Sequence, residues 1–342
     1  MKKRIHYIDL AKGLLMLIVV YGHLCGFGAI KDNSVILGIR YSAHTFISFY
    51  MPCFFILTGM CSNFGKPFGI FLWSGVKTLL LPTFAITACT FFLGESPVGG
   101  GIIRELVYLG WRTILYGGDF WFISAMFVAR ALYWIVDRIS IKKDYIKFLW
   151  CVVFFIVGFM LQLNLSVQIY WYLNHALLLM PFIGIGQYFK KKGFPSWLRK
   201  TVWIYPLILM IVILLAYNGL LRRDYFYYVP GITFAFVNLN WSMLIPLLLL
   251  AIFGSMALIS ISKDLDKCAF LEYIGRNSLI VYCVQGFLLK HVYNITNFML
   301  TDNNVFLSIL CVIITFATVL LLFLLIIYIL NIRYFRILIG KW

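Results

Sequence analysis

Long apolar runs alternate with short polar stretches along almost the whole chain. Ten of these runs are long enough to cross a hydrocarbon core of about 30 Å as helices. The segments of a membrane β-barrel would be shorter and would alternate with polar positions, whereas these runs are long and continuous. We therefore expect an all-α integral membrane protein, a bundle of about ten transmembrane helices. The predicted limits are 8–28, 43–63, 76–94, 119–138, 146–163, 169–189, 201–219, 241–261, 278–299 and 305–331.

Composition agrees with this pattern. Of the 342 residues, 63% are hydrophobic and 12% are charged, which is about half the charged fraction of a soluble domain. A formal net charge of +17 alone would fit a nucleic-acid-binding protein. The basic residues fall between the apolar runs, however, as at 142–143 and 190–192, which favours topology signals over a nucleic-acid surface. We expect the lipid bilayer as partner and no nucleic acid.

The positive-inside rule gives an orientation for the ten segments. With the N-terminus in the cytoplasm, 20 of the 29 Lys and Arg residues face the cytoplasm, seven face outside, and Lys12 and Arg130 lie within helices. This bias places both termini in the cytoplasm. Asp9 and Lys12 interrupt the first run where a signal peptide would be free of charge, so we expect a retained helix. No soluble domain interrupts the plan, and residues 1–342 are expected to form one membrane domain.

The two longest segments assigned to the outside are 95–118 and 220–240. The glycine triplet at 99–101 lacks the GK[ST] ending of a phosphate-binding loop, and a flexible connector is the expected role. Glu105 is expected to be solvated in this loop. The tyrosines of the second segment are typical of an interfacial aromatic belt, with glycan stacking as the alternative.

The first apolar run carries ionisable residues on one helical face. At 100° per residue, Lys12 and His23 lie about 20° apart around the axis and about 16 Å apart along it. Asp9 lies about 60° from Lys12 on the same face. Ionisable groups at membrane depth are costly and usually mark functional sites. Two structural explanations stay open, since Lys12 can extend to the interface and His23 can bond to a nearby backbone group.

The pattern Asp9-x2-Lys12-Gly13-x9-His23 resembles the first-helix signature of the acyltransferase 3 family of membrane-bound O-acyltransferases. Four later segments resemble that family in the same order, and the fucose 4-O-acetylase-like proteins are the most similar subgroup. These segments are FYMPCFFILTG at 49–59, KTLLLP at 77–82, FWFI at 120–123 and YIGRNSL at 273–279. Three positions depart from the family: Tyr50 and Gln285 stand where relatives often have histidine, and Ser74 where many have arginine.

The resemblance implies an acyl-CoA-dependent O-acyltransferase in the plasma membrane, the inner or cytoplasmic membrane of a bacterium. It would move an acyl group, acetyl by expectation, from cytoplasmic acetyl-CoA to a hydroxyl of a cell-surface glycan or its lipid-linked precursor, with no permanently bound cofactor. His23 would be catalytic, either as general base or as a transient acyl-histidine, and both roles stay open. The residues expected to bind the donor are Lys12, Asp9, Lys77 and Arg276.

Weaker candidates lie elsewhere. Asp119 and Trp121 begin the fourth segment, where they are suited to hold the acceptor sugar, although a helix cap and a belt tryptophan explain them equally well. Arg130 is an intramembrane cation with no obvious partner, and Asn174-His175 suits an interhelical hydrogen bond. The cysteines show no CxxC spacing, so no metal site is expected.

Two other functions remain as alternatives. A transporter or flippase for a lipid-linked sugar or small solute would also combine many spans with intramembrane charges. No inverted repeat and no Gly/Pro-broken helix pair is visible in the sequence, which counts against it. A family member that has lost catalysis is the third reading, and the presence of His23 argues against that.

Overall fold

The computed structural model describes residues 5–24, 33–93, 101–118, 120–140, 143–164, 169–195, 244–265, 267–300 and 304–340, with positions 204, 208 and 211. Within these residues every regular element is helical, which confirms the all-α prediction. The predicted segment 201–219 (apart from those three positions), the tyrosine-rich segment 220–240 and Asp119 lie outside the described residues.

The described chain forms a succession of helices, most of which coincide with predicted apolar runs. They are α1 (His6–Leu24), α2 (Ser34–Cys61), α3 (Phe68–Gly75), the π-helical turn η1 (Val76–Leu80), α4 (Leu81–Phe92), α5 (Ile102–Tyr116), α6 (Trp121–Ile139), α7 (Asp144–Asn164), η2 (Tyr170–Tyr172), α8 (Leu173–Lys192), α11 (Leu244–Asp264), α12 (Ala269–Arg276), α13 (Ser278–Thr296), η5 (Asn297–Met299), α14 (Val305–Leu330) and η6 (Arg336–Ile339).

Four of the described helical stretches are long and apolar enough to cross a membrane. They are His6–Leu24, Phe68–Thr90, Asp144–Gln162 and Val305–Leu330, and the bent pair of α5 and α6 adds a fifth if it counts as one span. These helices agree with a multi-pass membrane protein. The arrangement with ten spans stays a prediction.

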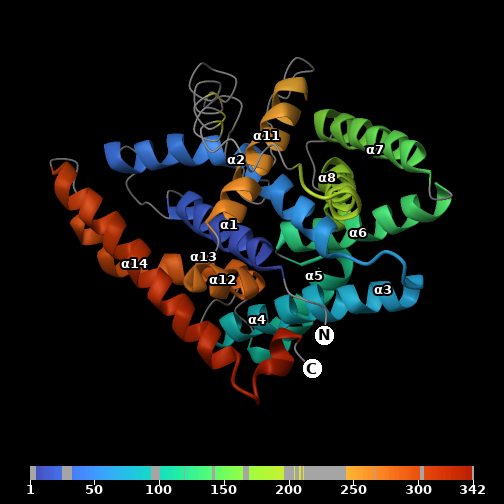
Figure 1. Ribbon diagram of the computed structural model, residues 1–342. Helices are drawn as coiled ribbons and strands as arrows, with labels where there is room; N and C mark the ends of the chain where they lie inside the picture. Colours follow the sequence, from blue (N-terminus) through green and yellow to red (C-terminus); the bar gives the residue numbers. More distant parts are fainter. Residues whose placement is uncertain are drawn as a thin grey trace.

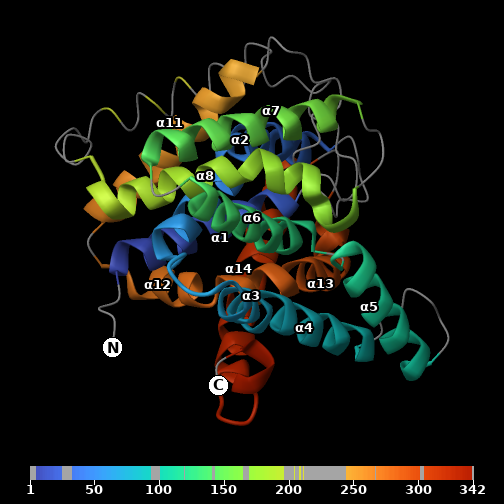
Figure 2. The same ribbon diagram turned by 90° about the vertical axis from the view of Figure 1, so that its right-hand side faces the viewer.

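Helix α1 occupies the middle of the bundle. It packs against α2, α11, α12 and α13, as Figure 1 shows (α1 in dark blue). On one side, α2 packs against α8, which in turn contacts α6 and α7; on the other, α13 packs against α14 (Figure 2). The first helix, which carries the candidate ionisable residues, is therefore enclosed by helices from both halves of the chain.

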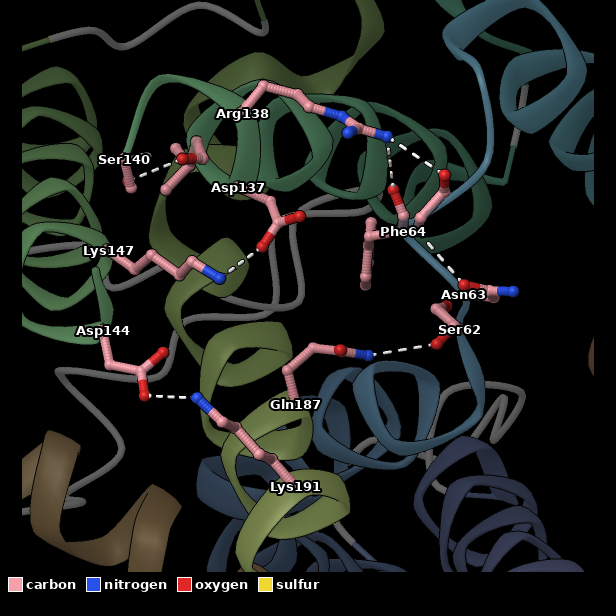
Figure 3. A network of polar contacts seen from close by, with 12 residues as sticks. Ser62, Asn63, Phe64, Asp137, Arg138, Ser140, Asp144, Lys147, Gln187 and Lys191 are labelled. Atoms are coloured by element: carbon pink, nitrogen blue, oxygen red, sulfur yellow. Dashed lines mark hydrogen bonds and ion pairs between the residues drawn. The ribbon is translucent and has the colours of Figure 1, made fainter. Parts of the chain in front are cut away.

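One end of this bundle collects basic side chains, and we call it the basic end. There Lys147 pairs with Asp137 at 2.5 Å and Lys191 with Asp144 at 2.7 Å, which joins α6, α7 and α8 (Figure 3). Arg138 donates to the backbone carbonyl of residue 65 at 3.1 Å in the segment between α2 and α3.

The first helix begins at this same end. The ammonium group of Lys263, at the end of α11, lies 4.9 Å from the ring of Tyr7 in α1 and 4.3 Å from the ring of Phe194 after α8. Four of the cations that the charge count assigned to the cytoplasmic side thus lie at this end, namely Arg138, Lys147, Lys191 and Lys263, and His23 lies toward the opposite end of α1.

The segment 95–118 is not simply the outer loop that we expected, because it contains helix α5. Its apolar residues are interrupted by Arg104, Glu105 and Arg112, so the run was too short and too charged to suggest a membrane helix. The expectation of a solvated Glu105 was wrong, since this residue is buried at 5% exposure. Positive φ angles at Gly117 and Gly118 then end α5, and the chain bends by 41° into α6.

Other boundaries differ for local reasons. Helix α2 begins at Ser34 rather than 43, because the Asn33 side chain accepts hydrogen bonds from the backbone N–H groups of residues 35 and 36 and so caps the helix. The third run begins earlier, at Phe68, and contains the π-helical turn η1. Helix α12 was not predicted, since eight residues are too few to produce a clear apolar run.

Candidate functional site

Helix α1 carries the candidate stripe without a break. It is helical from His6 to Leu24, so Lys12 and His23 lie on one face, about 16 Å apart along the axis, as the sequence predicts. Both residues are half-buried, whereas Leu15 and Val19 between them are fully buried. The stripe therefore keeps some access to its surroundings inside an otherwise enclosed helix.

His23 is held in one tautomer by its own helix. Its Nδ1 lies 2.7 Å from the backbone carbonyl oxygen of Val19, one turn earlier. A carbonyl can only accept, so Nδ1 must donate and the neutral ring keeps its lone pair on Nε2. Within the described part of the chain, Nε2 has no hydrogen-bond partner. A fixed imidazole with a free lone pair is suited to remove a proton or to attack a carbonyl carbon.

The opposite end of the stripe is built around a very close crossing of α1 and α12. A Cβ atom added to Gly13 would lie 2.1 Å from the carbonyl oxygen of Leu271. One added to Gly275 would lie 1.8 Å from the carbonyl oxygen of Asp9 and 2.8 Å from the Gly13 nitrogen. Only glycine fits at either position. Because Lys12 precedes Gly13 and Arg276 follows Gly275, the backbones of these two candidate cations are neighbours.

Acidic groups lie inside the same contact. Asp9 and Glu272 are both buried, and the Oε2 atom of Glu272 lies 3.1 Å from Nδ1 of His6. Sequence reasoning singled out Asp9 and missed Glu272. The signal that could have found Glu272 is its place three residues before Gly275, directly before the segment 273–279 that resembles the family.

The other predicted donor-binding residues are placed differently. The Arg276 side chain is exposed, and its Nε donates to the carbonyl oxygen of Glu272 at 3.1 Å. Lys77 lies on the π-helical turn η1, with its Nζ 5.3 Å from the ring of Trp73. Turn η1 packs against α3, α4 and α6. The structure thus brings the backbones of Lys12 and Arg276 together at one crossing and places Lys77 on a separate element.

The candidate acceptor residue Trp121 lies in an aromatic cluster. It is 6% exposed, which excludes a lipid-facing belt position, and its ring lies 5.3 Å from that of His175. The ring of the neighbouring Phe122 lies 5.3 Å from that of Tyr282, so the cluster connects α6 and α8 to α13. Tyr50 is also buried, in α2.

His175 is enclosed far more tightly than His23. It is 2% exposed, its Nδ1 lies 3.0 Å from Oδ1 of Asn174, and its Nε2 has no partner among the described residues. Asn174 donates to Gln162 at 2.6 Å, so the expected interhelical hydrogen bond is made by Asn174, between α8 and α7. Arg130 lies 5.1 Å from the ring of Phe71, a cation–π contact that accounts for an intramembrane cation.

A strained turn supports this aromatic cluster. Trp171 and Tyr172, just before α8, have φ angles of 57° and 52°, which bulky residues rarely adopt. The Trp171 indole donates to the carbonyl oxygen of Ile114 at 3.1 Å, and the ring of Tyr170 stacks on Tyr116. These contacts attach the beginning of α8 to the end of α5, beside the bend that leads into Trp121.

No group of three or more His, Cys, Asp or Glu side chains in the described part of the chain could hold a metal ion. Comparisons with curated proteins and with solved structures find no match. A family model described as "Acyltransferase domain" matches residues 5–330, nearly the whole chain and all the motifs discussed above. The chain therefore belongs to this acyltransferase family, acyltransferase 3.

Proposed function

We propose that this protein is a membrane-bound O-acyltransferase that uses acyl-CoA, with acetyl-CoA as the donor, and a hydroxyl of a cell-surface glycan or its lipid-linked precursor as the acceptor. We place it in the cytoplasmic membrane as one domain over 1–342, with about ten spans and both termini in the cytoplasm. Within its family we assign it to the fucose 4-O-acetylase-like subgroup.

The observation that carries the proposal is the state of His23. With Nδ1–H donated to Val19, Nε2 takes the proton of the acceptor hydroxyl while that oxygen attacks the thioester carbonyl. The tetrahedral intermediate collapses, the C–S bond breaks, and the departing thiolate receives the proton from His23 as free CoA. A covalent acyl-histidine would need the same free Nε2, so both routes begin from this tautomer.

The donor would approach from the basic end. Coenzyme A carries phosphate groups, which favour a cationic surface, and its pantetheine arm is long and uncharged. Lys12 and Arg276 supply positive charge at the α1–α12 crossing, with Lys77 as a further candidate and Asp9 as a partner that lowers the cost of burying a cation. The stripe of α1 would then lead from phosphate binding to chemistry at His23. Trp121 and Asp119 are proposed to hold the acceptor.

A transporter or flippase is the second candidate. The bend between α5 and α6 at Gly117 and Gly118 is the kind of broken helix pair that the sequence did not reveal, and it is the one observation that favours transport. The family match over residues 5–330 supports acyl transfer instead. Binding of labelled acetyl-CoA to the purified protein distinguishes the two, because a flippase of this kind has no site for the coenzyme.

The test of the proposed function is acetyl-CoA-dependent release of CoA, with acetylated glycan detected by mass spectrometry. His23→Ala should abolish transfer at normal protein levels. His291→Ala is the matched control, because Nδ1 of His291 bonds to the carbonyl oxygen of Phe287 at 2.9 Å in the same geometry, four residues back. Full activity of the His23 variant would overturn the mechanism, and wild-type protein without CoA release would overturn the function.

A further inference from the structure

We infer that Gly13 and Gly275 are positioning residues, which hold Lys12 and Arg276 together as a two-cation clamp for the phosphate groups of the acyl-CoA donor. This inference rests on the proposed function and goes one step further, since it assigns a role to two residues without side chains. The ligand chemistry is an organic phosphate attached to a pantetheine thioester.

The argument begins with the closeness of the crossing. An added Cβ on Gly275 would overlap the carbonyl of Asp9, and an added Cβ on Gly13 would overlap the carbonyl of Leu271. In both cases the obstacle is backbone, which cannot move aside as a side chain can. A methyl group at either position must therefore push α12 away from α1.

Such a displacement would directly increase the separation between Lys12 and Arg276. Lys12 and Arg276 are covalently next to the two glycines, one on each helix, so the distance between their backbones follows the distance between the helices. A phosphate that both cations bind needs both of them within a few ångströms. Widening the crossing separates the clamp while leaving His23, about 16 Å away along α1, in place.

Helix α12 is positioned mainly by its packing against α1. With eight residues it is too short to be stable by itself, so its placement depends on its contacts. Its contacts with α1 include the glycine crossing and the contact between Glu272 and His6 at 3.1 Å. Arg276 lies on this same short helix, so any shift of α12 away from α1 also moves Arg276.

The chain contains a matched crossing that lacks the cations. A Cβ on Gly186 of α8 would lie 2.0 Å from the carbonyl oxygen of Ile56, and one on Gly59 of α2 would lie 2.3 Å from that of Ile183. The two helices approach each other nearly as closely as α1 and α12 do, but Ile185 precedes the glycine where Lys12 precedes it in α1. An alanine at Gly186 therefore shows how widening a helix crossing affects the protein when no pair of candidate donor-binding cations is separated.

The experiment compares two donors in the full-length protein, acetyl-CoA and S-acetylpantetheine, which has the thioester but no phosphate. For Gly275→Ala and Gly13→Ala we expect the KM for acetyl-CoA to rise at least tenfold, with the KM for S-acetylpantetheine and kcat within twofold of wild type. Gly186→Ala should leave the ratio of the two KM values unchanged. Equal effects of Gly275→Ala on both donors would show a merely structural role and overturn the inference.

Two further measurements keep the test decisive if a methyl group prevents folding. Glu272→Gln weakens the same contact without adding an atom, and it should raise the KM for acetyl-CoA two- to fourfold and spare S-acetylpantetheine. In the background of Arg276→Gln, this effect should shrink, because the clamp is already broken. If the wild-type protein is inactive with both donors, the proposed function is wrong. If the wild-type protein is active but the variants affect both donors equally, only the inferred clamp is wrong.

Discussion

Helices α1 and α8 are built with the same two devices. Each has a glycine at a crossing too close for any side chain, Gly13 against α12 and Gly186 against α2. Each also has a histidine whose Nδ1 is engaged, His23 with the carbonyl of Val19 and His175 with the side chain of its neighbour. In both helices the histidine lies about three turns from the glycine.

The surroundings of these devices differ. Beside the glycine, α1 has Lys12 and α8 has Ile185. His23 is half-buried, so Nε2 can meet a substrate, whereas His175 is closed in by Trp121 and Tyr172. Both helices therefore have a close crossing and a histidine whose Nδ1 is engaged. Only α1 also has a cation beside the glycine and a histidine that a substrate can reach, and only α1 is therefore a candidate site.

The largest effect on donor binding is expected when Lys12 is replaced by isoleucine, the residue that precedes the crossing glycine in α8. Lys12→Ile should raise the KM for acetyl-CoA about 30-fold, because hydrogen bonds to charged groups contribute about 1.5–3 kcal/mol. Thermal melting in detergent should also fall, since the substitution leaves the buried carboxylate of Asp9 without its proposed cation. Steady-state kinetics and a melting curve on the same preparation check both parts. An unchanged KM would remove Lys12 from the donor site and make α1 and α8 equivalent in this respect.

The sequence predicted much of the α1 side. Continuous apolar runs placed most helix centres correctly, because burial in lipid leaves a long one-dimensional pattern. The stripe of Lys12 and His23 followed from helical geometry alone, and the helix is unbroken between them. What the pattern could not give is which other helix meets Gly13, since α12 is short and far away in the chain.

The sequence predicted less around α8. Trp121 was equally consistent with a lipid-facing belt, and its burial beside His175 in the structure decides against that. Helix α5 was missed because three charged residues divide its apolar positions, yet Glu105 is buried rather than solvated. Packing of this kind depends on contacts between segments that are distant in the sequence, and the periodicity of apolar residues does not predict such contacts.

A second prediction tests whether His175 is structural. His175→Ala should lower the free energy of unfolding by about 2 kcal/mol, because it leaves a cavity beside Trp121 and Tyr172. His175→Phe should recover most of that loss by filling the space with an apolar ring. Unfolding in detergent measures both variants, with acetyl transfer as a parallel readout. A lower kcat in a well-folded His175→Phe protein, with the KM for the acceptor unchanged and Trp121 therefore undisturbed, would place chemistry on α8 and overturn the contrast with α1.

A smaller effect is expected between α7 and α8. Gln162→Leu removes the hydrogen bond from Asn174 at 2.6 Å, and such bonds between membrane helices contribute about 0.6 kcal/mol on average. Melting temperature should fall slightly while the KM for acetyl-CoA stays unchanged. Asn174→Leu is the companion variant, because it removes the same bond from the other side. A changed KM in either variant would connect α8 to donor binding, against its assignment as scaffold.

The smallest effect is expected for an ion pair at the basic end. Lys191, in the last turn of α8, pairs with Asp144 at 2.7 Å, and both side chains are more than half exposed (Figure 3). Exposed pairs contribute at most about 1 kcal/mol and are screened by salt, so Asp144→Asn should change stability only slightly, and less in high salt. The corresponding contact at the beginning of α1 is a hydrogen bond between His6 and the buried carboxylate of Glu272. Melting curves of Asp144→Asn and Glu272→Gln at low and high salt test the comparison. A larger and salt-independent loss is expected for the α1 variant, because its carboxylate is shielded from solvent. The reverse order would show that the end of α8, rather than the α1–α12 contact, is the more firmly held of the two.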